Sequence, residues 1–277
     1  VYTINANQSF IGSCEIEAFS SKNLKIPYSA IMIVYECEKS ISMVHSYGRV
    51  YSNIEVEDGK TISDGHEGCW ILKDSKNIES YAVLHNGYES QAEQIISLTI
   101  KNHKEEIKNI SIKCKRLNPY ETLIIKPIDH FKELVNFLND KEGSCTMHFS
   151  LNKSFTRALL CWQTKDQSQL QVTHSNFDYS SHETDFIQSK EKKAYMIVPP
   201  LKNKMIKTKV YADRAPGNYL IKVNNGKENK ISSSLFSLQN SINDELIFSR
   251  EDGLLPSRIV TGIEISSSIS SNTIPCE

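Results

Sequence analysis

The most constraining feature of this 277-residue chain is a block that occurs twice, first over residues 42–52 and again over residues 171–181. In each copy an apolar run leads to a His-Ser pair, continues through aromatic and polar residues, and reaches a Tyr-Ser pair. A Gly-Ser-Cys triplet precedes both copies, at residues 12–14 and 143–145. The pattern predicts an internal duplication with a unit of about 125–130 residues, the size of one domain.

Short apolar or alternating runs, separated by turn residues, fill both halves of the chain. Residues 30–35 form a continuous apolar run of the kind that is buried between two layers. Residues 95–101 and 107–113 alternate apolar and polar side chains, which is the period of a half-buried strand. The sequence therefore predicts an all-β protein, built from two tandem β-sandwich or barrel-like domains.

Between the halves the apolar positions change to helical spacing, at Ile128, Phe131, Leu134, Val135 and Leu138. Asp129 is placed to cap the start of such a helix, and Gly143 is placed to stop it. We therefore predict one short amphipathic helix between the domains. The predicted parts are a first β domain at 1–126, a connecting helix at 127–142 and a second β domain at 143–277, related to the first by duplication.

Charge and hydropathy exclude two classes of partner. The chain carries 32 Lys and Arg against 33 Asp and Glu, a formal net charge of −1, so no long-range field attracts nucleic acid. No apolar run approaches the roughly 18 residues of a membrane-spanning helix. We expect neither a nucleic-acid partner nor a membrane span. Because the first residue is not Met and the chain ends abruptly, we also expect it to be part of a longer polypeptide.

The seven cysteines show neither a C-x-x-C pair nor a zinc-binding spacing. Five of them lie inside apolar, strand-like runs. We therefore predict reduced thiols that act as small core residues, which indicates a cytoplasmic protein.

Both copies of the repeated block end in side chains suited to a polar ligand. Aromatic rings beside planar polar groups favour a sugar or another polar small molecule, and a loop at residues 65–68 adds a second His and a Glu. The predicted ligand-binding residues are His45, Tyr47, Arg49, His66, Glu67, His174, Phe177, Asp178 and Tyr179. The alternative for each histidine is a hydrogen-bonded strand end that fixes a turn.

A second possibility concerns only the later copy. His174, His182 and Asp185 offer the imidazole and carboxylate ligands that a divalent metal ordinarily takes. The earlier copy has Arg49 near the position of Asp178, so both copies cannot hold the same ion. The chain contains no phosphate loop, dinucleotide glycine pattern, Gly-x-Ser-x-Gly or His-Glu-x-x-His.

These observations predict a non-catalytic tandem β-domain binding or scaffold module, carbohydrate-related, that binds a polar small molecule or glycan without a cofactor. A metal-dependent enzyme with its site in the second domain is the alternative. The sequence indicates no oligomeric state.

Overall fold

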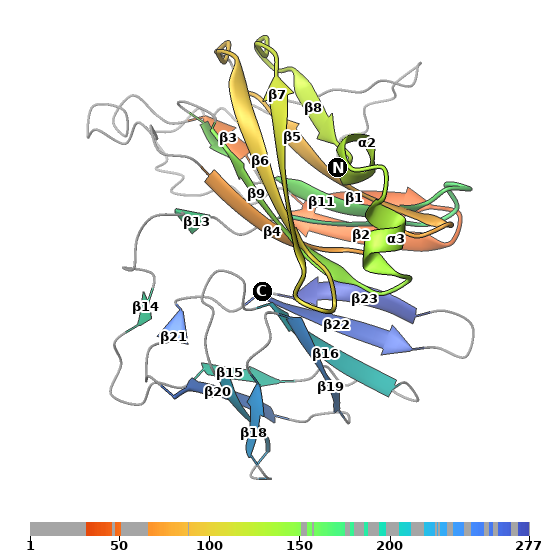
Figure 1. Cartoon of the computed structure of the whole chain (residues 1–277), viewed down its shortest axis with the longest axis vertical. Coiled ribbons are helices and arrows are strands. Elements are labelled where there is room, and N and C mark those ends of the chain that lie inside the picture. The colour runs from red at the N-terminus through yellow and green to blue at the C-terminus, as the bar shows by residue number, and fades with distance from the viewer. Residues whose placement is uncertain are drawn as a thin grey trace, which may run out of the picture.

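The computed structural model is mostly β-strand, in several antiparallel sheets, with two short helices in the part that it describes (Figure 1). The all-β prediction is confirmed. The described residues are 32–45, 48–50, 66–87, 89–150, 154–156, 158–174, 178–179, 186–187, 194–197, 205–211, 219–224, 226, 228–231, 235–240, 245–251, 255–256, 260–266 and 271–276.

Two sheets form a β-sandwich. Sheet I has the strand order β13-β4-β9-β6-β7, and sheet II has the order β12-β11-β5-β8. The strands of sheet I are β4 (His66–Leu72), β6 (Gln94–Lys101), β7 (Ile107–Cys114), β9 (Gly143–Phe149) and β13 (Asp178–Tyr179). Those of sheet II are β5 (Ile78–His85), β8 (Thr122–Ile125), β11 (Leu159–Thr164) and β12 (Leu170–His174).

The core lies between the two sheets and follows from the alternation of the strands. Leu98 of β6 and Met147 of β9 point inward from sheet I, and Leu84 of β5 and Leu160 of β11 point inward from sheet II. All four side chains are almost fully buried in one cluster. Packing of two antiparallel sheets across such a layer is a β-sandwich, one of the two arrangements between which the sequence left the choice open.

The remaining described strands form further sheets. Two of these are four-stranded, with the orders β15-β20-β17-β18 and β19-β16-β22-β23, and three are the pairs β1-β2, β10-β3 and β14-β21. Their bounds are β1 (Met32–Cys37), β2 (Ser40–His45), β3 (Gly48–Val50), β10 (Ser154–Thr156), β14 (Phe186–Ile187), β15 (Ala194–Ile197), β16 (Met205–Tyr211), β17 (Tyr219–Val223), β18 (Glu228–Ile231), β19 (Leu235–Asn240), β20 (Glu245–Arg250), β21 (Leu255–Pro256), β22 (Val260–Ser266) and β23 (Ser271–Cys276).

The helical segment is two short helices, α2 (Pro127–His130) and α3 (Leu134–Leu138), where the sequence predicts one. The break lies at Phe131, whose backbone is not helical (φ −139°, ψ 88°). Its ring packs edge-on against Phe137, with the ring centroids 5.5 Å apart. Packing of this aromatic pair against the core therefore takes the place of a continuous helix.

The predicted ends of the helix are also wrong. Lys126 occupies the N-cap position of α2, and Asp129 lies inside the helix. Helix α3 is capped at its C-terminal end by Asn139, which adopts the left-handed conformation (φ 53°) and donates its backbone N–H to the carbonyl of Val135. Gly143, the predicted stop, is instead the first residue of β9.

Strands from both sides of the helical segment share the sandwich. In sheet I, β9 lies between β4 and β6, and in sheet II, β11 lies between β12 and β5. Leu134 and Leu138 of α3 are buried in the same core. The predicted boundary at residues 127–142 therefore falls inside this sandwich, and the internal duplication is not confirmed.

A hairpin of β1 (Met32–Cys37) and β2 (Ser40–His45) lies beside β12. Along the edge of β12, two serine hydroxyls accept hydrogen bonds that a neighbouring strand would otherwise accept with its backbone. Ser40 Oγ accepts the N–H of Leu170 at 2.7 Å, and Ser42 Oγ accepts the N–H of Val172 at 3.2 Å. The apolar runs that open the two repeated blocks thus lie side by side, and Val44 and Val172 belong to one buried cluster.

Replacing Ser40 and Ser42 together with alanine should loosen this hairpin. The loss of both hydroxyls removes about 1.5 kcal/mol of docking free energy, which corresponds to about a tenfold faster amide exchange in β1 and β2. Hydrogen exchange with mass spectrometry measures this, with β6 as an internal reference. Ser111→Ala, at an exposed position of β7, is the control. Unchanged exchange in the hairpin would show that the serines do not hold it.

The predicted role of the cysteines is confirmed where their side chains are described. Cys114, Cys145 and Cys161 are buried thiols that form no disulfide, and Cys37 is a half-buried one. Within the described residues, no helix has both the length and the apolar character to cross a bilayer.

Candidate functional site

Strand pairing brings four of the predicted ligand-binding residues together. Strand β13 pairs with the start of β4, so Asp178 lies opposite Glu67 and Tyr179 lies opposite His66. The sequence places these pairs far apart, and only the topology of sheet I makes them neighbours.

The two histidines of the repeated block end neighbouring strands. His45 is the last residue of β2, opposite Met32, and His174 is the last residue of β12, opposite Leu159. Arg49 lies in β3, opposite Phe155 of β10. The predicted residues that lie outside the described part of the chain are Tyr47, Phe177, His182 and Asp185.

The predicted metal site therefore stays a prediction, because two of its three residues lie outside the described part. Among the residues that were described, no group of three or more His, Cys, Asp or Glu side chains is arranged to hold a metal ion.

The outward face of β5 and β8 gathers polar and aromatic side chains that the sequence analysis missed. Strand β5 turns Ala82 and Leu84 into the core, so the residues between them point away from it. Strand β8 buries Ile125 and leaves Ile124 40% exposed. The outward residues are Glu79, Tyr81, Val83 and His85 of β5, Thr122 and Ile124 of β8, and the adjoining Lys126; we call this set the β5–β8 face.

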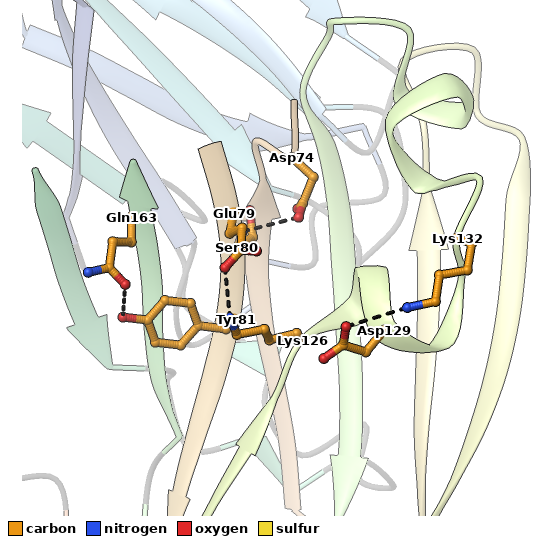
Figure 2. Close-up of polar contacts among 8 residues, drawn as sticks. All are labelled: Asp74, Glu79, Ser80, Tyr81, Lys126, Asp129, Lys132 and Gln163. Carbon is orange, nitrogen blue, oxygen red and sulfur yellow. Dashed lines mark hydrogen bonds and ion pairs between the residues drawn. The ribbon is translucent and has the colours of Figure 1, made fainter. Parts of the chain in front are cut away.

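One end of the β5–β8 face carries an ion pair beside an aromatic ring (Figure 2). The Nζ atom of Lys126 lies 2.7 Å from Oε2 of Glu79, and both side chains are about one-third exposed, at 37% and 31%. The same Nζ atom lies 5.9 Å from the ring centroid of Tyr81, within the range of a cation–π contact. The lysine is therefore held by two groups of β5.

The phenol of Tyr81 is held from the other side by sheet II. Its hydroxyl donates to Oε1 of Gln163 on β11, at 3.3 Å, as Figure 2 shows. Burial raises the pKa of Tyr81, so the phenol is neutral across the ordinary pH range. Burial also raises the pKa of the neighbouring Cys161 thiol to about 12, so this cysteine has no thiolate character at neutral pH.

A second polar pair lies farther along the β5–β8 face. Nδ1 of His85 is 2.9 Å from Oγ1 of Thr122, and the two residues are directly opposite in the β5–β8 ladder. Burial lowers the pKa of His85, so its imidazole is neutral at pH 7. The exposed Ile124 lies opposite Val83, between this pair and Tyr81.

A buried acid lies behind the start of β5. Asp74 is 2% exposed, and its Oδ1 accepts the backbone N–H of Ser80 at 3.1 Å. Its Oδ2 is buried and has no hydrogen-bond partner among the described residues. Burial raises the pKa of Asp74 to about 6; hydrogen bonds from Ser80 oppose this rise, and the charge of Glu79 adds to it. Asp74 is therefore largely ionised at pH 7.

Part of this site could have been found in the sequence. The run at residues 78–85 alternates, which places Glu79, Tyr81 and His85 on one face of a strand. What the sequence does not show is that Lys126 and Gln163 lie beside that face, because their positions depend on the pairing of β8 and β11 with β5.

Comparisons with known proteins do not assign a family. No protein-family model matches the sequence, and no curated protein matches it. Among solved structures, the comparison finds the lectin of Pleurotus ostreatus (POL) in its apo form. It is 8% identical, with 90% of this chain and 85% of that chain covered, and the TM-score is 0.24. A TM-score this low carries no argument about fold or ligand.

Proposed function

We propose that this chain is a non-catalytic binding module, and that its β5–β8 face binds a polar ligand of the carbohydrate type. The observation that carries the proposal is the fixed ring of Tyr81, with Gln163 on its hydroxyl and Lys126 beside its ring. The C–H surface of a sugar packs on such a ring, and its hydroxyls exchange hydrogen bonds with amide, carboxylate and ammonium groups.

The groups of the β5–β8 face are held in place by the protein, which favours binding. Lys126 is paired with Glu79, and His85 is paired with Thr122. Because each long side chain already has a partner, a ligand immobilises few additional rotors when it binds. The ring of Tyr81 has only two rotatable bonds and supplies a large contact area at a small loss of entropy.

The pairs at the edge of sheet I are a second candidate surface. Asp178 opposite Glu67 and Tyr179 opposite His66 combine aromatic and polar residues that the sequence analysis assigns to a ligand. Alanine substitution of Glu67 and of Tyr179 tests this surface separately, since neither residue belongs to the β5–β8 face.

Replacing Tyr81 with leucine should weaken ligand binding about tenfold, because the aromatic contact is lost while apolar packing against the buried cluster of Val44 and Cys161 is kept. A screen of the full chain against immobilised oligosaccharides identifies the ligand, and calorimetric titration then measures its affinity for each variant. Lys132→Ala removes an exposed lysine from the nearby Asp129–Lys132 ion pair and is the matched control. A Tyr81→Leu variant that binds as tightly as the parent would place the ligand elsewhere.

A further inference from the structure

We infer that the β5–β8 face selects an uncharged, hydroxyl-rich ligand and discriminates against an acidic one. The inference deepens the proposed binding function and rests on it. It concerns the electric charge of the β5–β8 face, and this charge is determined by the contacts that the side chains of the face make.

The positive charge that Lys126 brings to the β5–β8 face is already neutralised by Glu79. Lys126 supplies the face with its ammonium group, and Oε2 of Glu79 lies 2.7 Å from it. An acidic ligand that approaches Lys126 has to displace Glu79 or share the ammonium with it. Either way the ligand gains little net Coulomb energy, because a carboxylate already occupies the position that it would take.

The other polar groups of the β5–β8 face carry no charge at neutral pH. The imidazole of His85 is neutral and bonded to Thr122. Tyr81 is a neutral phenol, and Gln163 is an amide. These groups offer hydrogen bonds of the kind that sugar hydroxyls exchange, and they offer no compensation for a carboxylate or sulfate.

A negative charge lies behind the β5–β8 face. Asp74 accepts the backbone N–H of Ser80, the residue that lies between Glu79 and Tyr81 on β5, and among the described residues no cation donates a hydrogen bond to it. Together, Lys126, Glu79 and Asp74 leave an excess of one negative charge near the ring. On neighbouring elements Lys73 lies 3.3 Å from Glu142, and Lys132 lies 3.5 Å from Asp129, so each of these lysines is paired with a carboxylate. The excess negative charge of Lys126, Glu79 and Asp74 therefore opposes an anionic ligand at the ring.

The test compares neutral oligosaccharides with acidic forms of the same chains. The neutral ligands are lactose, maltose and cellobiose. Each is paired with the same sugar in which one residue is replaced by its uronic acid, and both members of a pair are titrated against the full chain at low salt. The parent protein should bind the neutral member of a pair at least tenfold more tightly. Glu79→Gln should reduce this preference at least fivefold, because it frees the ammonium of Lys126. Asp129→Asn, which removes a carboxylate from the adjacent helix α2, should leave the preference unchanged.

The outcomes separate the two proposals. Tighter binding of acidic members by the parent protein, or an unchanged preference in Glu79→Gln, would overturn the selectivity and leave the binding function standing. Failure of every neutral and acidic sugar to bind would overturn the binding function itself, and the selectivity with it.

Discussion

Replacing Gly143 with alanine is expected to lower the free energy of unfolding by about 3 kcal/mol. A Cβ atom at this position would lie 2.5 Å from the backbone oxygen of Lys101 and 2.6 Å from Cδ2 of Leu138. Both distances are far below van der Waals contact. The residue is buried, so the added methyl group has no open space to move into.

The effect is large because three elements meet at this glycine. Gly143 begins β9, Lys101 ends β6, and Leu138 ends α3 in the core of the sandwich. The Leu138 side chain could rotate away, but the carbonyl of Lys101 is part of the β6 backbone and moves only with the strand. Relief of the clash therefore separates β9 from β6 or lifts α3 from the core.

Urea unfolding of Gly143→Ala, followed by circular dichroism, measures this effect. Gly226→Ala is the comparison, because Gly226 is exposed and its added Cβ would meet only the carbonyl of Val223, at 2.9 Å. We expect a smaller loss there. A loss below about 1 kcal/mol in Gly143→Ala would show that the close approach of α3, β6 and β9 is wrong.

Replacing Asp74 with asparagine is expected to stabilise the protein at pH 8 by up to about 3 kcal/mol. The pKa of Asp74 is about 6 in the folded protein, against an ordinary value of 3.8, mainly because burial disfavours the carboxylate. Each unit of such a shift corresponds to about 1.4 kcal/mol. The asparagine amide keeps an oxygen that can accept the N–H of Ser80.

The stability of the parent protein depends on pH through the protonation of Asp74, and the effect of the substitution therefore also depends on pH. Below pH 3.8 the carboxyl is protonated in both folded and unfolded chains, so its ionisation does not lower the free energy of unfolding. Between pH 3.8 and about 6 the folded protein binds the proton more tightly, and the stability of the parent protein falls as the pH rises. Above about pH 6 the loss is complete, so the stability gained by Asp74→Asn should grow from near zero at pH 4 to its full value at pH 8.

Asp166→Asn provides a control of opposite sign. A hydrogen bond from the Thr164 hydroxyl, with further bonds from Ser168, lowers the pKa of this exposed carboxyl to about 2. Its stabilising contribution is present above pH 3.8 and is lost as the pH falls through 2. The variant should therefore lose stability at neutral pH.

The buried charge of Asp74 would be contradicted if the difference in stability between Asp74→Asn and the parent protein did not change with pH.

The strands of the sandwich could be predicted because their pattern is local. The alternating runs at 95–101 and 107–113 became β6 and β7 almost residue for residue. The helical segment was predicted in the right place but as one helix, because apolar spacing does not reveal that Phe131 leaves the helix to pack against Phe137. The pairing of the strands could not be predicted from this local pattern, because β9 and β11 pair with strands that precede the helices.

The candidate site was predicted less well, for a related reason. The repeated histidines are the most visible motif of the sequence, and the structure places His45 and His174 at the ends of β2 and β12. Lys126, by contrast, belongs to no motif. Its role comes from the ladder that sets β8 beside β5 and thereby brings it to Glu79. A site formed by pairing between distant strands leaves no signal at any one position.

The central claim is that the β5–β8 face is a binding surface, and amide chemical-shift mapping with a neutral oligosaccharide tests it most directly. The isotope-labelled full chain is titrated with the tightest-binding oligosaccharide from the screen. We expect shift changes that cluster at residues 79–85 and 122–126 and that require about tenfold more ligand in Tyr81→Leu. Changes confined to other parts of the chain, or changes that need the same ligand concentration in the parent and in Tyr81→Leu, would contradict this claim.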